Sequence, residues 1–517
     1  MTTEATIADS YNDVPYPSGP QPHSHPCHLA MVAALFGQPT TAIGNCRVLE
    51  LGCASGGNLI PMALNFPGSH FVGIDLSSRQ IADGQSMVDQ LSINNIELRH
   101  QSILEFTDDI EPFDYIICHG VFSWVPRAVQ DRILSIGRDL LTQQGIMYVS
   151  YNTYPGWHLR GTVRDMMRYH SASFRTADEK LSQCRSLLKF LIESAKAGSE
   201  TYRQILKDEA EHLNGHDDAY IYHEHLEENN EPFYFHQFME RVTEQGLRYL
   251  GDADFTRMLT NQFDDETAAI LSDAPLLRQE QYIDFLTARS FRCSLLCRPS
   301  LRLDRNVTPS RLFGLSLSLS EPLQIADENS AETRFMGRSH SASTSQPVLK
   351  AVLRELVRHW PAWEKTERLL ELIQLSLAGS PSTELRANIL EDLLLLLSRG
   401  MVEAKLEPPA VAMHPGQRPL ASPWARLQSR EGMTAVTNRR HMPVELSQLH
   451  HFVLSKLDGE QDRQQLSSQL LFASVNGSFK MVNSDQTATT LDHYECDKLL
   501  EKVLGDLTDS TLLEPSS

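Results

Sequence analysis

The segment from Cys46 to Asp75 constrains the fold of this chain more than any other. An apolar run, VLEL, stops at a glycine-rich turn, GCASGG; a helix-like segment and a second apolar run, FVGI, then lead to Asp75. This order predicts a strand, a tight loop, a helix and a strand that ends on a carboxylate. Glycine lets a backbone turn sharply and approach a ligand, and a carboxylate at a strand end can accept both ribose hydroxyls. The unit therefore predicts an adenosine-type ligand.

The residues of the loop discriminate between adenosine ligands. A dinucleotide fingerprint reads G-x-G-x-x-G, but its second glycine is Ala54 here, and Glu50 stands just before the loop. A carboxylate there would repel a pyrophosphate and suits a cation, such as the sulfonium or ammonium of S-adenosylmethionine (SAM). The E-x-G-x-x-x-G form of Glu50, Gly52 and Gly56 resembles motif I of class I SAM-dependent methyltransferases, and Asp75 resembles their ribose-binding acid. The alternative is a glycine turn in a purely structural βαβ unit.

Composition excludes several classes of protein. A chain of 517 residues is too long for one core, so two to four domains are expected. The sequence shows neither an apolar run of membrane-spanning length nor a leader pattern, and its eight cysteines are scattered without a C-x-x-C pair. The net charge of −20 argues against a general nucleic-acid binder. We expect a reduced, cytoplasmic protein with no membrane insertion and no nucleic-acid partner.

Strand and helix patterns alternate after Asp75. The expected elements are a helix over 78–91, a strand over 96–99, an apolar strand over 113–118, a helix over 125–141 and a strand over 146–150. This spacing predicts a doubly wound parallel sheet of α/β class. Residues 160–213 read as an inserted helical segment, and strands near 246–250 and 290–297 are expected to complete the sheet.

A family resemblance extends well beyond the loop. The stretches YNDVPY, LELGCASGGNLIPMA, FVGIDLS, FDYIICHGVFSWVP and YVSYNTYPGW together resemble bacterial methyltransferases with a "methyltransferase regulatory domain", which include rickettsial protein lysine methyltransferases. EHLEENNEPFYFHQF, GLRYLGDADF and EQYIDFLTARSFRCSLL resemble that regulatory region, and LDGEQDR resembles the start of the C-terminal module. The resemblance implies SAM as the cofactor and a protein or peptide as the substrate. Where the family has Asp-Ile after the third strand, this chain has Ser102-Ile103, which weakens an expected contact with the adenine amino group.

The chain divides into segments on these grounds. We expect an N-terminal lid and lead-in helix over 1–45, and a Rossmann-like, seven-stranded SAM-dependent methyltransferase domain over 46–305. Within that domain lie a helical insertion, about 160–235, and the regulatory region, about 220–305. A linker over 306–347 and two mainly helical, winged-helix-like modules, over 348–406 and 442–517, complete the division.

Two sets of residues are predicted to form the site. The resemblance, carried over position by position, gives the cofactor-binding residues Glu50, Gly52, Cys53, Ala54, Gly56, Asp75, Leu76, Ser102, Ile103 and His119. Aromatic and polar residues that follow strand ends, together with one on the lid, give the catalytic and substrate-side residues Tyr16, His119, Trp124, Asn152 and Tyr154. Aromatic faces hold alkylammonium groups, although each of these aromatics could equally pack the sheet edge.

Two histidine-rich clusters are not predicted to bind metal. His23, His25, Cys27 and His28 lie on a proline-rich arm without rigid geometry, and His223, Glu224, His225 and His236 are expected to be a polar helix and its surface partners. The favoured function is a SAM-dependent N-methyltransferase acting on an amine, with protein lysine as the acceptor implied by the resemblance. The alternatives are a methyltransferase for a small molecule or biosynthetic peptide, and a non-catalytic SAM-binding adaptor. A homodimer is one option for the oligomeric state.

Overall fold

The computed structural model describes residues 4–515 apart from 108–110, 196–197, 328–330, 378–381, 477–480, 483–487 and 490–491. The chain forms two compact units. Unit 1 comprises Met1–Ser18, Gln38–Leu59 and Phe66–Leu303, and unit 2 comprises Gly19–Gly37, Ile60–Asn65 and Asp304–Ser517. None of the described helices has the length and apolar character needed to cross a bilayer.

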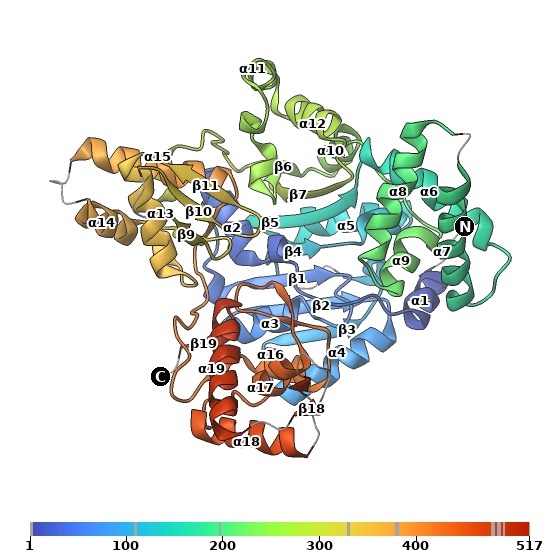
Figure 1. The fold of residues 1–517 in the computed structure, drawn as a ribbon. Coiled ribbons are helices and arrows are strands. Elements are labelled where there is room, and N and C mark those ends of the chain that lie inside the picture. Colours follow the sequence, from blue (N-terminus) through green and yellow to red (C-terminus); the bar gives the residue numbers. More distant parts are fainter. Residues whose placement is uncertain are drawn as a thin grey trace. The chain divides into compact units, whose positions relative to one another are not determined.

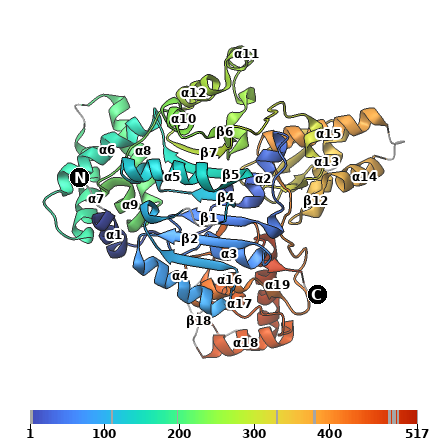
Figure 2. The same ribbon diagram turned by 180° about the vertical axis from the view of Figure 1, so that it is seen from behind.

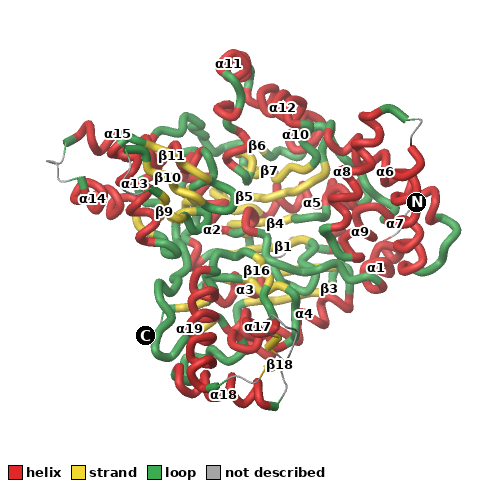
Figure 3. The backbone as a smooth tube through the Cα atoms, viewed as in Figure 1, coloured by secondary structure: helices red, strands yellow, loops and turns green. Residues whose placement is uncertain are grey.

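Unit 1 is built on a seven-stranded sheet in the order β3-β2-β1-β4-β5-β7-β6 (Figures 1 and 3). The strands are β1 (Arg47–Leu51), β2 (His70–Asp75), β3 (Ile96–His100), β4 (Phe113–Cys118), β5 (Leu141–Asn152), β6 (Arg248–Asp252) and β7 (Phe291–Cys297). The first five strands run parallel, whereas β7 is antiparallel to both of its neighbours. The central strands are buried along almost their whole length, as their continuous apolar runs predict. The predicted seven-stranded, Rossmann-like sheet is confirmed.

Two amphipathic helices pack against the parallel strands. Helix α4 (Ser78–Leu91) contacts β2 and β3, and α5 (Arg127–Leu140) contacts β4 and β5. Ser77 caps α4, because its side chain accepts a hydrogen bond from the Gln80 amide. A third helix, α3 (Leu59–Asn65), follows the glycine-rich turn. These connections place the strand ends that carry the predicted site residues along one edge of the sheet.

Four helices occupy the segment predicted as a helical insertion (Figure 2). They are α6 (Gly156–Ser171), α7 (Ala177–Ser194), α8 (Glu200–Asn214) and α9 (Asp218–Leu226). Their buried faces form a core of their own, with Val163, Leu181, Leu206 and Ile221 among its members. Three more helices, α10 (Phe235–Glu244), α11 (Asp265–Asp273) and α12 (Leu276–Thr287), accompany β6 and β7.

The N-terminal residues contain a helix that the sequence did not predict. Helix α1 (Glu4–Asp13) packs against α4 and lies beside α9 in both ribbon views (Figures 1 and 2). Its polar composition hides the helical period, and Pro15 and Pro17 prevent the helix from continuing. The predicted lead-in helix is α2 (Pro26–Leu35), which belongs to unit 2 and packs against β13 (Val402–Lys405).

Unit 2 combines short strands with helices. Strands β12 (Glu364–Lys365), β8 (Ser316–Leu319) and β13 form one antiparallel sheet with helices α13 (Pro347–His359), α14 (Thr366–Ser376) and α15 (Thr383–Ser398). Between β8 and α13 in the sequence, three strands form an antiparallel meander: β9 (Gln324–Ala326), β10 (Thr333–Met336) and β11 (Ser341–Thr344). The described part of residues 306–347 therefore contains four strands, where a linker was predicted. Polar residues alternate along these strands, so their composition resembles that of a loop.

The C-terminal module has α16 (Pro423–Arg430), α17 (Gln448–Leu454), α18 (Arg463–Val475) and α19 (His493–Asp509). Its strands are β14 (Leu420–Ala421), β15 (Ala435–Thr437), β16 (Pro443–Glu445), β17 (Met481–Val482), β18 (Ala488–Thr489) and β19 (Leu513–Glu514). Its core includes Ala421, Ala425 and Val436 as well as residues of α17 to α19. The module thus begins earlier than the predicted boundary at 442.

Candidate functional site

The glycine-rich turn follows β1 and is held against the end of β2. Gly52 has a φ of +79° and Gly56 a φ of +76°, both in the left-handed region that favours glycine. A Cβ atom on Gly52 would lie 2.4 Å from Cγ2 of Val121, so a side chain has no room there. The amides of Gly52 and Cys53 donate to the Ile74 carbonyl at 2.9 and 3.0 Å. Ala54 also has a positive φ, of +49°, so predicted cofactor residues 52–56 form one strained turn.

Glu50 is a buried carboxyl near the end of β1 with one satisfied oxygen. Its Oε1 accepts a hydrogen bond from Nδ2 of Asn58 at 2.7 Å, whereas its buried Oε2 has no hydrogen-bond partner among the described residues. Burial raises the pKa of Glu50 to about 8; the Asn58 hydrogen bond opposes this shift, and the nearby Asp75 adds to it. A buried carboxyl with an unsatisfied oxygen is costly on its own. A cation placed beside it would remove that cost.

Asp75 ends β2 with both oxygens fixed by the backbone. Its Oδ2 accepts from the Ala54 amide and its Oδ1 from the Ser77 amide, both at 2.8 Å. Burial raises the pKa of Asp75, and the hydrogen bonds from Ser77 and Ala54 work against that rise. Leu76 follows, and its carbonyl contacts Nε2 of His100 at 3.1 Å. Because β1 and β2 are neighbours, Glu50 and Asp75 border the same turn.

The segment after β3 adds the predicted adenine-side residues. Ser102 is buried, and its Oγ accepts from the Leu104 amide at 3.1 Å, which caps the short helix that begins at Ile103. Strand β3 lies beside β2, so this turn is at the same edge of the sheet as Asp75. The position is therefore consistent with the predicted role of Ser102.

His119 follows β4 and is held by a buried phenol. Its Nδ1 lies 2.9 Å from the Tyr148 hydroxyl, which donates to Sγ of Cys293 at 3.0 Å. Burial raises the pKa values of Tyr148 and Cys293, the latter to about 12, so both groups are neutral near pH 7. The Tyr148 hydroxyl therefore lies between the His119 ring and the Cys293 thiol and orients that ring.

The substrate-side predictions lie in different environments. Trp124 meets Trp157 edge-on with ring centroids 6.2 Å apart, and Tyr154 stacks on His158 at 3.9 Å. Trp124 and Tyr154 are both partly exposed, so their rings can contact a substrate. Asn152 is 2% exposed, and its Nδ2 donates to Oδ1 of Asn230 at 3.1 Å. Its packing ties the end of β5 to the segment after α9.

Tyr16 lies apart from these aromatics, against α9. Its ring centroid is 5.5 Å from that of His223, and burial raises its pKa. His223 and His225 are 3% and 1% exposed, so the prediction that these histidines are surface partners was wrong. Helix α9 packs against α6 and α7, while His223 stacks on Tyr11 of α1 and His225 contacts Glu209 of α8, which the alternating polar sequence does not reveal. No group of three His, Cys, Asp or Glu side chains within the described ranges could hold a metal ion.

The histidines before α2, in unit 2, have structural contacts. Nδ1 of His25 accepts from the Cys27 amide at 3.1 Å and caps α2. The rings of His23 and His28 stack with centroids 4.9 Å apart. The His25 side chain in this arm therefore has a structural role as the N-cap of α2.

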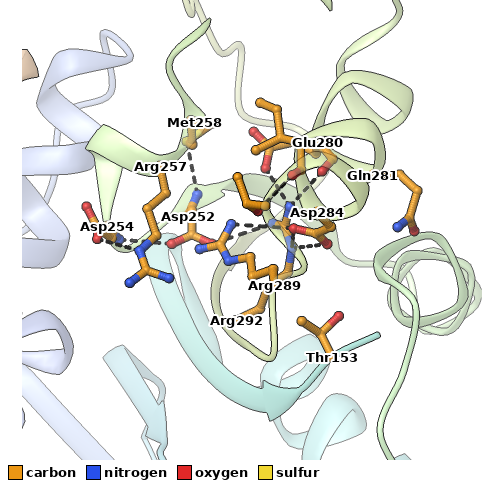
Figure 4. A network of polar contacts seen from close by, with 12 residues as sticks. Thr153, Asp252, Asp254, Arg257, Met258, Glu280, Gln281, Asp284, Arg289 and Arg292 are labelled. Carbon is orange, nitrogen blue, oxygen red and sulfur yellow. Dashed lines mark hydrogen bonds and ion pairs between the residues drawn. The ribbon is translucent and has the colours of Figure 1, made fainter. Parts of the chain in front are cut away.

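A buried ion network, which the sequence did not predict, supports the segment after β5 (Figure 4). Arg292 contacts Asp284 at 2.8 Å and Glu280 at 2.9 Å, and Arg289 contacts Asp252 at 2.8 Å. All five side chains are buried. The network fixes the loop between α12 and β7.

That loop in turn holds the backbone around Tyr154. The Ser290 carbonyl accepts from the Thr153 amide at 2.8 Å, and the Arg289 carbonyl accepts from the Gly156 amide at 2.9 Å. A Cβ on Gly156 would lie 2.2 Å from the Ala288 carbonyl oxygen, so this approach requires glycine. The regulatory region thus positions residues predicted to face the substrate.

Three family models match this chain. A "Methyltransferase domain" model matches residues 44–223, and a "Predicted methyltransferase regulatory domain" model matches residues 217–298. A "PKMT, C-terminal winged helix domain" model matches residues 417–512. The matches cover the sheet, the insertion, the region around the ion network and the C-terminal module.

Relatives match over most of the length. An uncharacterized protein of Rickettsia prowazekii is 34% identical over 498 residues, which cover 93% of this chain and 89% of that protein. A second from the same organism is 40% identical over 215 residues, 42% of this chain and 86% of that protein. The structure of PKMT2 from Rickettsia typhi in complex with AdoHcy matches with a TM-score of 0.88 and 29% identity, covering 96% of this chain and all of that one.

Proposed function

We propose that this chain, which belongs to the family of bacterial SAM-dependent methyltransferases with a regulatory domain and a PKMT-type winged helix domain, methylates lysine side chains of a protein. It is a SAM-dependent methyltransferase. The observation that carries the choice of acceptor is the whole-length structural match to PKMT2, which includes the C-terminal module as well as the catalytic sheet. The partly exposed aromatics Trp124 and Tyr154 support an alkylammonium acceptor.

The site fits SAM by its own chemistry. The unsatisfied oxygen of Glu50 is suited to a cation of the amino-acid end, and Asp75 is fixed at the strand end where a ribose would be held. The turn over 52–56 lets the backbone approach the ligand, and Ser102, which follows β3 at the same edge of the sheet, would face the adenine. When bound, SAM supplies a methyl group on a sulfonium, so that the leaving group is already activated.

The residues of the chain would hold and deprotonate the acceptor. A lysine ammonium has an ordinary pKa of about 10.4, so it must lose a proton before it can react. The His119 ring, which Tyr148 orients, follows β4 at the strand ends of the site, where it would face the incoming amine as the candidate base. Apolar surroundings favour the neutral amine, and Tyr154 would orient its methylenes.

Incubation of the full chain with methyl-labelled SAM and a bacterial lysate tests this proposal. Label recovered on lysine residues of protein bands, identified by mass spectrometry, is the expected result. Label confined to small molecules would favour the biosynthetic alternative, and SAM binding without transfer would favour an adaptor. Glu50→Gln provides the matched control, because it changes one atom of the cofactor site and leaves the aromatics intact.

A further inference from the structure

A segment of unit 1 before the first strand bridges the cofactor loop and the helical insertion. We call Ser10–Ser18 the strap. Oδ1 of Asn12 accepts from the Ser77 hydroxyl at 2.8 Å. Ser77 is also the residue whose amide donates to Asp75. Oγ of Ser18 accepts from the Gly57 amide at 2.8 Å. The strap is thus bonded to both turns that border the cofactor site.

On its other side the strap is bonded to α9. The Val14 carbonyl lies 2.7 Å from Nε2 of His223, and the Tyr11 ring stacks on the His223 ring with centroids 4.4 Å apart. The Ser10 hydroxyl donates to Oε1 of Glu227 at 2.7 Å. His223 is the centre of this contact and is almost fully buried.

Both ring nitrogens of His223 face acceptor oxygens. A carbonyl oxygen only accepts, so Nε2 must donate to Val14. Nδ1 lies 2.8 Å from Oε1 of Glu227, and the pKa of Glu227 is lowered: burial opposes this, but hydrogen bonds from His223 and Ser10 outweigh it. The His223 ring thus bridges the strap and a buried carboxylate.

Further polar groups surround His223 and Glu227. Arg164 from α6 donates to the Glu227 carbonyl. The other titratable groups around His223 and its carboxylate partner are Tyr11 and Tyr16 of the strap, Tyr222 and Glu224 of α9, and Asp75 beyond Tyr11. Burial raises the pKa of each of these phenols, which keeps them neutral.

We propose that His223 is a positioning residue that latches the strap over the SAM-binding turns and slows release of the cofactor. The inference rests on the cofactor of the proposed function and is independent of the methyl acceptor. Glu227 must stay ionised to accept the hydrogen bonds from His223 and Ser10, so the latch weakens in strong acid.

The test measures dissociation of S-adenosylhomocysteine from the full chain by displacement with excess SAM at one fixed pH. His223→Gln retains a donor for Val14 but loses the contact between the His223 ring and Glu227. We expect its release to be roughly 10-fold faster than that of the unaltered chain, the size of one charge-assisted hydrogen bond. Measuring both proteins at the same pH keeps the protonation of Glu50 equal in the comparison.

A second readout follows the strap itself. Hydrogen exchange of residues 8–18 should be faster in His223→Ala than in the unaltered chain at pH 6, with little change in the central strands. Asn12→Ala breaks the other end of the strap, so its effect on release should not add to that of His223→Ala. If His223→Ala fails to fold, Asn12→Ala and His223→Gln carry the test.

The proposal is overturned if His223→Gln releases the ligand as slowly as the unaltered chain does, or if strap exchange is unchanged. Absence of any ligand binding by the unaltered chain would instead overturn the cofactor assignment. Binding whose release is accelerated in His223→Gln, without lysine methylation, would leave the latch standing and remove the proposed acceptor.

Discussion

Two buried groups of carboxylates in unit 1 differ in what neutralises them. Around β6 and β7, Asp252, Glu280 and Asp284 share the guanidinium groups of Arg289 and Arg292. At the glycine-rich turn, Glu50 has only the neutral Asn58 amide as a hydrogen-bond partner within the described residues, and one of its oxygens has none.

This difference distinguishes buried acids with a structural role from a buried acid with a binding role. A buried charge is tolerated when a fixed cation and hydrogen bonds surround it, and then its removal affects the fold. A buried carboxyl without a cation keeps a raised pKa, as Glu50 does, and becomes favourable only when a cationic ligand arrives. Variants in the two groups should therefore separate stability from cofactor binding.

The largest effect is expected in the arginine network. Arg292→Ala leaves three carboxylates around one remaining guanidinium, which should lower the stability of unit 1 by about 3–5 kcal/mol. Urea unfolding followed by tryptophan fluorescence measures the loss. Arg99→Ala is the matched control, because its ion pair with Glu97 is partly exposed and should contribute at most about 1 kcal/mol. Equal losses for the two variants would contradict the comparison.

The next largest effect concerns Asp75. Asp75→Ala should weaken SAM binding roughly 10–100-fold, because it removes a carboxylate whose hydrogen bonds to a ligand are charge-assisted, while lowering stability far less than Arg292→Ala. Asp114→Ala is the control: this carboxylate also accepts a backbone amide, that of Arg47, but lies at the start of β4, away from the strand ends of the site. Calorimetry should find normal SAM affinity for Asp114→Ala. A similar loss in both variants would remove Asp75 from the site.

The smallest effect is expected on the substrate side. Tyr154→Leu should raise KM for the acceptor about 3–10-fold with kcat nearly unchanged, since it removes a cation–π face that holds the ammonium before reaction. Tyr169→Leu is the control, because this tyrosine is 89% exposed on the helical insertion. Steady-state kinetics with the identified acceptor measure both. A fall in kcat alone would show that Tyr154 acts in the reaction rather than in binding.

The sequence predicted the sheet and the cofactor turn because both leave local signals. Buried parallel strands read as apolar runs, and a turn in the left-handed region requires glycine at positions such as Gly52. The resemblance then identified Asp75 and the regulatory region. These features depend on neighbours close in the sequence.

What the sequence did not reveal depends on distant partners. His223 contacts Val14, 209 residues earlier, so its burial leaves no periodic signal near either residue. Arg292 looks like a surface charge in the run RSFRCS until Glu280 and Asp284 surround it. The short strands within 306–347 pair with one another and with β12 and β13, which a local composition count cannot register.

The most direct test of the account is the proton released when SAM binds. At pH 7 a pKa of about 8 leaves Glu50 about nine-tenths protonated in the free protein, and a cation beside it lowers that pKa. SAM affinity should therefore increase as the pH rises toward about 8 and level off above it. Calorimetry at pH 7 in two buffers of different ionisation heat should find that the unaltered chain releases close to one proton when SAM binds. Glu50→Gln should release about one proton fewer and should bind SAM more weakly. Equal proton release and equal affinity for the two proteins would contradict the claim that this carboxyl awaits a cationic cofactor.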